Sequence, residues 1–191
     1  LMKMTTQYAA KVYGSGHVIA YNLVRNAHDA FDHGTYGPPD DWPRTPRDRM
    51  PVANDFYNND MSNMHDDRIE VDGMTYNARL LRNKCVNSAG SAFSAAPAFG
   101  GPTYVVRNIA YPLPSNFDSI KGGDAPGLVL YNNTFVSALR TPGPTADVRN
   151  NLILAEFPEE SAVMTTSGIT PLNAPRGGGA ATPAPLPDLR I

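Results

Sequence analysis

The feature that most constrains this chain is an asparagine that recurs at one position of a repeated pattern. The intervals between its six copies are 37, 24, 25, 25 and 18 residues, and the copies are Asn22, Asn59, Asn83, Asn108, Asn133 and Asn151. A short apolar run surrounds each copy. Self-similarity at a period of this size indicates a solenoid, in which each unit buries its apolar side chains only against the next unit.

Three neighbouring columns of the repeat keep their polarity. The third residue before the asparagine is always apolar: Ile19, Phe56, Leu80, Val105, Leu130 and Val148. The second residue after it is also always apolar: Val24, Met61, Cys85, Ala110, Phe135 and Ile153. The residue directly before the asparagine is almost always polar. Because a column of constant polarity has a constant orientation, we expect the two apolar columns to face a core and Cys85 to be a buried thiol.

The repeat units have the composition of strands. They are short, rich in Val, Ile, Tyr and Phe, and bounded by Asn, Gly and Pro. Coils of parallel strands lie ~4.8 Å apart, so the asparagine amide can bond its equivalents in the coils above and below, or satisfy a tight turn. A leucine-rich repeat lacks support because the L-x-x-L-x-L frame is absent, and a hexapeptide left-handed helix fits only the interval of 18 residues.

Three phrases of the repeat resemble those of right-handed parallel β-helix repeat proteins, the pectate-lyase-like superfamily; they span residues 101–108, 131–136 and 149–154. The resemblance covers about residues 16–156 and implies an all-β, right-handed parallel β-helix of about six coils. It also implies action on polysaccharides, a secreted or cell-surface location and, in many members, calcium. Since one scaffold hosts many activities, the resemblance bears on the fold more than on the function.

The repeat sets the expected domain organisation. We expect a β-helix domain over residues 1–157, a Pro-rich loop insertion at 34–53 within it, and a tail rich in Pro, Gly and Ala over 158–191. No capping helix is evident before the first coil. An uncovered solenoid end exposes strand edges and core, so we expect either a piece of a longer protein, which lacks its N-terminal cap, or a protein that self-associates through its open end.

Composition excludes some partners. The formal net charge is −2 and only 18% of the residues are charged, so no polybasic surface indicates nucleic-acid binding. No apolar run approaches the ~20 residues of a membrane span. We therefore expect neither a nucleic-acid partner nor a membrane span.

A His-Asp pair is shared by the first two coils. His28-Asp29 and His65-Asp66 lie 37 residues apart, as do the asparagines of these coils, whereas the third coil has Ala89-Gly90 at the equivalent place. Stacking predicts His28 beside His65 and Asp29 beside Asp66.

Alternation after the second pair predicts an outward-facing strip. Ile69 and Val71 alternate with three charged residues, and in a strand such a set faces one side, so the strip is Arg68, Glu70 and Asp72. We expect Ser94 beside Glu70 in the next coil, and either Asp32 or His33 beside it in the preceding coil.

These residues indicate two kinds of chemistry. Carboxylates can act as acid and base on a glycosidic bond or bind a hard cation such as calcium. The candidate catalytic residues are Glu70, Asp66, Asp67, His65, His28 and Lys121, the last as the base of a lyase. The candidate calcium ligands are Asp66, Glu70 and Asp72. The candidate substrate-binding residues, which suit an acidic sugar, are Trp42, Tyr36, Arg44, Arg47 and Arg68.

Two functional hypotheses remain open, beside a third in which the chain is a fragment whose active strip lies elsewhere in a longer protein. The first is a lyase or glycoside hydrolase that cleaves an acidic polysaccharide in a groove on coils one to three. The second is a non-catalytic β-helix that binds glycan or serves as a surface or assembly module. In the second hypothesis the Asn, Asp and His side chains only satisfy turn backbone, which is their common role in turns.

Overall fold

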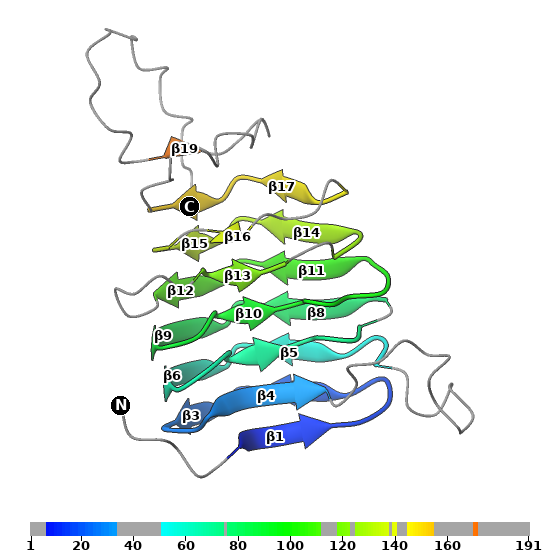
Figure 1. The fold of residues 1–191 in the computed structure, drawn as a ribbon, viewed down its shortest axis with the longest axis vertical. Coiled ribbons are helices and arrows are strands. Elements are labelled where there is room, and N and C mark those ends of the chain that lie inside the picture. The colour runs from blue at the N-terminus through cyan, green and yellow to red at the C-terminus, as the bar shows by residue number, and fades with distance from the viewer. Residues whose placement is uncertain are drawn as a thin grey trace, which may run out of the picture.

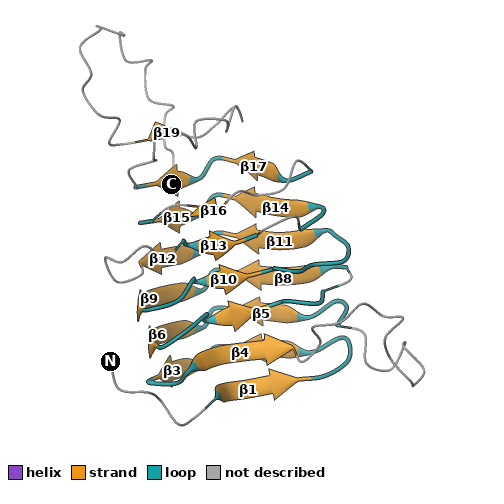
Figure 2. Cartoon of the chain, in the orientation of Figure 1, coloured by secondary structure: helices purple, strands orange, loops and turns teal. Residues whose placement is uncertain are grey.

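The computed structural model describes residues 7–33, 51–74, 76–111, 118–122, 125–137, 139–140, 145–154 and 170–171. They form strands and turns, and no helix long and apolar enough to cross a membrane occurs among them. The strands lie in three parallel sheets, which we name A, B and C (Figures 1 and 2). This all-β architecture of parallel strands confirms the predicted class and is compatible with a β-helix.

Each sheet takes one strand from each circuit of the chain. Sheet A contains β1 (Tyr8–Val12), β4 (Asp29–His33), β7 (Ile69–Glu70), β10 (Phe93–Ser94), β13 (Ile120–Lys121) and β16 (Leu139–Arg140). Sheet B contains β2 (Val18–Ala20), β5 (Asp55–Tyr57), β8 (Ala78–Leu81), β11 (Thr103–Val106), β14 (Leu128–Tyr131) and β17 (Asp147–Arg149). Sheet C contains β3 (Leu23–Arg25), β6 (Asp60–Met64), β9 (Lys84–Ser88), β12 (Ile109–Tyr111), β15 (Thr134–Phe135), β18 (Leu152–Ile153) and β19 (Thr170–Pro171).

The apolar columns of the repeat form the core between the sheets. From the second coil onward, both columns are buried at every position. In the first coil Ile19 and Val24 are partly buried and pack against the same core. Cys85 is fully buried, and burial raises the pKa of its thiol to about 12. The predicted inward orientation of both columns, and of Cys85, is confirmed.

The six asparagines form one continuous hydrogen-bonded ladder between sheets B and C. In each rung, Nδ2 donates to Oδ1 of the asparagine in the next coil, over 2.8–3.0 Å. The same Oδ1 also accepts the backbone N–H of the preceding asparagine. From Asn59 onward, Nδ2 makes a second bond to the carbonyl three residues before the previous asparagine. Donors and acceptors are therefore matched along the buried stack, as the sequence predicted.

The polar column before each asparagine has a conformational cause that the sequence pattern did not reveal. All six residues have positive φ, between 53° and 60°, and they are Tyr21, Asn58, Arg82, Arg107, Asn132 and Asn150. This left-handed conformation is unfavourable for most residues and best tolerated by asparagine and glycine. Three of the six are asparagine, so the column reflects the turn conformation as well as exposure.

Two strands lie outside the six coils that the asparagines mark. β1 precedes the first asparagine and pairs in parallel with β4, and β19 lies within the predicted tail and pairs with β18. At the end of the predicted insertion, Val52 forms a parallel bridge with Tyr76. Residues 34–50 of the insertion, and the tail apart from β19, lie outside the described residues.

We expect Asn108→Ala to lower the free energy of unfolding by about 2–4 kcal/mol, because the buried Asn83 N–H loses its acceptor and the side chains of Asn83 and Asn133 each lose one hydrogen bond. Urea unfolding followed by circular dichroism measures this loss. The matched control is Asn22→Ala, since Asn22 is exposed at the end of the ladder and Asn59 loses only one neighbour. Equal losses in the two variants would show that the interior rungs contribute no more than the end.

Candidate functional site

A row of polar residues crosses the strands of sheet A at one register position. Lys11 pairs with Asp32, Asp32 with Glu70, Glu70 with Ser94, and Ser94 with Lys121. We call these five residues the sheet A row; beyond Lys121 the same register position continues to Arg140 in β16. The predicted position of Ser94 beside Glu70 is confirmed, and the open choice between Asp32 and His33 is resolved in favour of Asp32.

Ion pairs hold both ends of the sheet A row. Lys11 Nζ lies 2.6 Å from Asp32 Oδ2. Lys121 Nζ lies 2.8 Å from Oδ2 of Asp67, a buried residue that also accepts the Ser91 N–H. The side chains of the two lysines are 22% and 29% exposed, so each is partly accessible from outside. The row therefore has a cation at each end and carboxylates between them.

The alternation used to place Arg68 outward fails, because β7 contains only Ile69 and Glu70. Arg68 lies in the turn before β7 and is fully buried, so the expected exposed guanidinium is wrong. Its Nη1 donates to the Gly90 carbonyl at 2.8 Å, and burial lowers its pKa to about 10.

Asp72 is also buried rather than facing outward with Glu70. It follows β7 in a turn, where strand alternation no longer applies. Its Oδ1 accepts the Ser94 hydroxyl at 2.6 Å and the Ala96 N–H at 2.8 Å. One oxygen of this carboxylate is thus already committed to the neighbouring coil.

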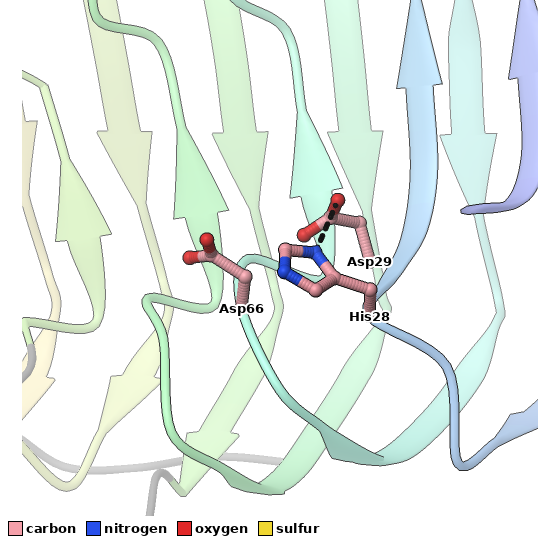
Figure 3. A group of neighbouring side chains, drawn as sticks. All are labelled: His28, Asp29 and Asp66. Carbon is pink, nitrogen blue, oxygen red and sulfur yellow. Dashed lines mark hydrogen bonds and ion pairs between the residues drawn. The ribbon is translucent and has the colours of Figure 1, made fainter. Parts of the chain in front are cut away.

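The two His-Asp pairs meet at the turn that leads into sheet A. The rings of His28 and His65 have centroids 4.8 Å apart, and His28 Nδ1 lies 3.0 Å from Asp29 Oδ2. His28, Asp29 and Asp66 each offer a ligand atom, and these atoms lie within 4.8 Å of one another (Figure 3). The predicted stacking of both pairs is confirmed.

The backbone explains why the third coil lacks a His-Asp pair. A Cβ atom at Gly90 would lie 2.4 Å from the backbone carbonyl carbon of Asp66. Only glycine fits this close approach, so the next coil cannot place an aspartate above Asp66. Ser88 Oγ completes the turn by bonding the Asp66 carbonyl.

The carboxylates of the site differ in their pKa values. Burial raises the pKa of Glu70 to about 8, and the charges of Asp29, Asp72 and Asp32 add to the effect. Burial also raises the pKa of Asp29 and of Asp72 to about 6. At neutral pH the site thus combines a protonated Glu70 with ionised aspartates, a division that acid-base catalysis requires.

The lysine and histidine of the site hold their protons more firmly than usual. Burial alone would lower the pKa of Lys121, but its bond to Asp67 and the surrounding carboxylates raise it. The bond to Asp29 raises the pKa of His28. A lysine held in this way is a poor base at neutral pH, which weighs against the role predicted for Lys121.

Four predicted substrate-binding residues cannot be placed, and one residue of the sheet A row was not predicted. Trp42, Tyr36, Arg44 and Arg47 lie outside the described residues. Lys11 was missed, because its strand precedes the first asparagine and the repeat used for alignment starts only there. The short apolar run around Lys11 at residues 8–12 is its only sequence signal.

Comparisons with known proteins do not assign this chain to a family. The chain matches no protein-family model, no curated protein and no solved structure. The residues of the candidate site are therefore the basis for a functional proposal.

We expect the free energy of unfolding to fall as the pH rises from about 6.5 to 8. Burial raises the pKa of Glu70 in the folded protein to about 8, above the ordinary value of 4.5 that the unfolded chain has, so the folded state binds more protons in this window and loses stability as they leave. His28 has the same sign, since its pKa is also raised. Below this window the lowered pKa of buried His33, about 4, opposes the trend.

Urea unfolding of wild type and Glu70→Gln across this pH range measures the effect. The variant should be the more stable of the two at pH 8 and show a flatter profile. Asp60→Asn, on sheet C, is the control and should keep the wild-type slope. Parallel profiles for wild type and Glu70→Gln would contradict the burial of Glu70 as an acid.

Proposed function

We propose that this protein is a carbohydrate-active β-helix protein that binds and cleaves an acidic polysaccharide on the outer face of sheet A. We infer a right-handed helix of the pectate-lyase-like class, since parallel crossover connections are right-handed in nearly all cases. The observation that carries the proposal is the register of Glu70 between Asp32 and Ser94, with Lys11 and Lys121 at the ends. A secreted or cell-surface location is part of the same proposal.

The spacing of the row suits an extended polymer. Successive members stand on neighbouring strands, ~4.8 Å apart. Asp32 and Ser94 are fully buried, so a glycan lying across the strands would meet the partly exposed Lys11, Glu70 and Lys121. The two lysines offer positive charge to its carboxylate or sulfate groups. Their own aspartates, Asp32 and Asp67, hold them in place.

Hydrolysis fits these residues better than elimination. Glu70, which remains protonated at neutral pH, donates a proton to the glycosidic oxygen. The neighbouring Asp32 is the candidate second carboxylate, either as nucleophile or as the base that activates water; because it is fully buried and ion-paired with Lys11, this role requires that the pair opens when the glycan binds. Elimination would need a base beside the sugar carboxylate, and Lys121 is held protonated by Asp67.

Calcium, which the family resemblance implies, does not fit the predicted ligands. One carboxylate oxygen of Asp72 already accepts hydrogen bonds from the Ser94 hydroxyl and the Ala96 N–H. Asp66 is grouped with His28 and Asp29 rather than with Glu70. Calcium prefers six to eight oxygen ligands, so no step of the proposed reaction depends on it.

A non-catalytic glycan-binding or assembly module is the second candidate. It is favoured by one observation: both lysines of the row are already bonded to aspartates of the same face. Such closed ion pairs also occur in purely structural networks.

We expect Glu70→Gln to lower the rate of hydrolysis roughly 10²–10⁴-fold, the usual contribution of a general acid. A panel of uronic-acid and sulfated polysaccharides is incubated with each protein, and new reducing ends and unsaturated ends are assayed separately. Asp60→Asn should retain the wild-type rate. Circular dichroism confirms that both variants are folded.

Each outcome separates the hypotheses. Unsaturated ends in place of simple reducing ends would replace hydrolysis with elimination. Undiminished activity in folded Glu70→Gln would remove Glu70 from the mechanism. Binding to a polysaccharide without any product would favour the second candidate.

A further inference from the structure

We propose that His28, Asp29 and Asp66 bind a divalent transition-metal ion of the zinc class. These three residues are distinct from those of the sheet A row, although they lie beside it, and the inference does not depend on the polysaccharide reaction. It also differs from the calcium site expected from sequence, because it replaces Glu70 and Asp72 with an imidazole and a different carboxylate.

The backbone of two neighbouring coils holds the three donors together. Asp29 is the first residue of β4, and Asp66 lies in the turn after β6, one coil further on. The Asp66 N–H donates to the His28 carbonyl at 2.8 Å, so stacking of the coils fixes the distance between the two turns. Figure 3 shows the His28 imidazole lying between the two carboxylates.

A buried carboxylate oxygen without a hydrogen-bond partner among the described residues favours a cation ligand at this point. Asp29 is only 4% exposed, and its Oδ1 has no hydrogen-bond partner among the described residues. Leaving a buried carboxylate oxygen unsatisfied is costly. Its Oδ2, by contrast, is bonded to His28 Nδ1 at 3.0 Å, and this bond sets the orientation of the ring.

The two copies of the His-Asp pair make different hydrogen bonds. In a turn ladder that only repeated, both copies would make the same ones. In the first copy His28 bonds its own aspartate. In the second copy His65 Nδ1 is buried with no hydrogen-bond partner, and the carboxylate of Asp66 groups with His28 instead. The ring of His65 packs against that of His28 and supports it.

The donor set selects the class of metal. Calcium and magnesium favour sites built from oxygen alone, whereas imidazole nitrogen favours zinc, copper, iron and nickel. One imidazole and two carboxylates make three protein ligands. Three ligands leave a fourth position of a tetrahedral zinc site for water or another small ligand.

Isothermal titration of the full chain with ZnCl₂, and separately with CaCl₂, tests the inference. We expect one zinc ion per chain and weaker calcium binding. His28→Gln and Asp66→Asn should each weaken zinc binding roughly 10- to 100-fold or more, since even the loss of a supporting residue has an effect of that size. Glu70→Gln and Asp60→Asn are matched controls that should bind zinc as the wild type does.

Several results would overturn the inference. These are the absence of stoichiometric zinc binding, calcium binding tighter than zinc, and zinc binding that His28→Gln and Asp66→Asn leave unchanged. Loss of zinc binding in Glu70→Gln would instead place the ion among the sheet A row. If Asp66→Asn fails to fold, His28→Gln decides alone, because the side chain of His28 is 30% exposed and its replacement leaves no buried gap.

Discussion

The buried amide ladder is the interaction on which the rest of the structure depends. Each asparagine side chain bonds both a backbone carbonyl of one coil and the asparagine of the next, so consecutive coils cannot slide past one another. A slip by one residue would break the rungs and turn the apolar columns outward. The ladder therefore sets the register of sheets B and C directly and that of sheet A through the chain between them.

Register in sheet A assembles the candidate site from residues far apart in sequence. Lys11 and Lys121 are separated by 110 positions, counted from their residue numbers, yet belong to one row. This assembly also brings several carboxylates close together, where their charges repel one another. Glu70 is surrounded by aspartates, and its pKa rises to about 8 because burial and their charges oppose its ionisation. Such clusters are retained at functional sites more often than elsewhere, which supports a chemical role.

The two halves of the site differ in chemistry as they differ in place. The sheet A row, which crosses the strands, contains a carboxylic acid of raised pKa, a second carboxylate and two cations. The turn group of His28, Asp29 and Asp66 offers a nitrogen and two oxygens at a single point. Gly90 ends this group, because the backbone of Asp66 leaves no room for a side chain in the next coil.

The sequence by itself determined what depends on the repeat. The asparagine spacing predicted the ladder, the two buried columns, the burial of Cys85 and the stacking of His28 on His65, since a stacked repeat places equivalent residues one above another. The pairing of Ser94 with Glu70 followed from the same alignment.

Only the tertiary structure decided what happens where the repeat or the strand stops. Arg68 and Asp72 flank a strand of two residues, so alternation could not predict their burial or their bonds to the next coil. Lys11 precedes the first asparagine, and no repeat position marked it. The raised pKa of Glu70 depends first on its burial and then on charges that other coils bring near it, and a linear pattern of residue types contains neither.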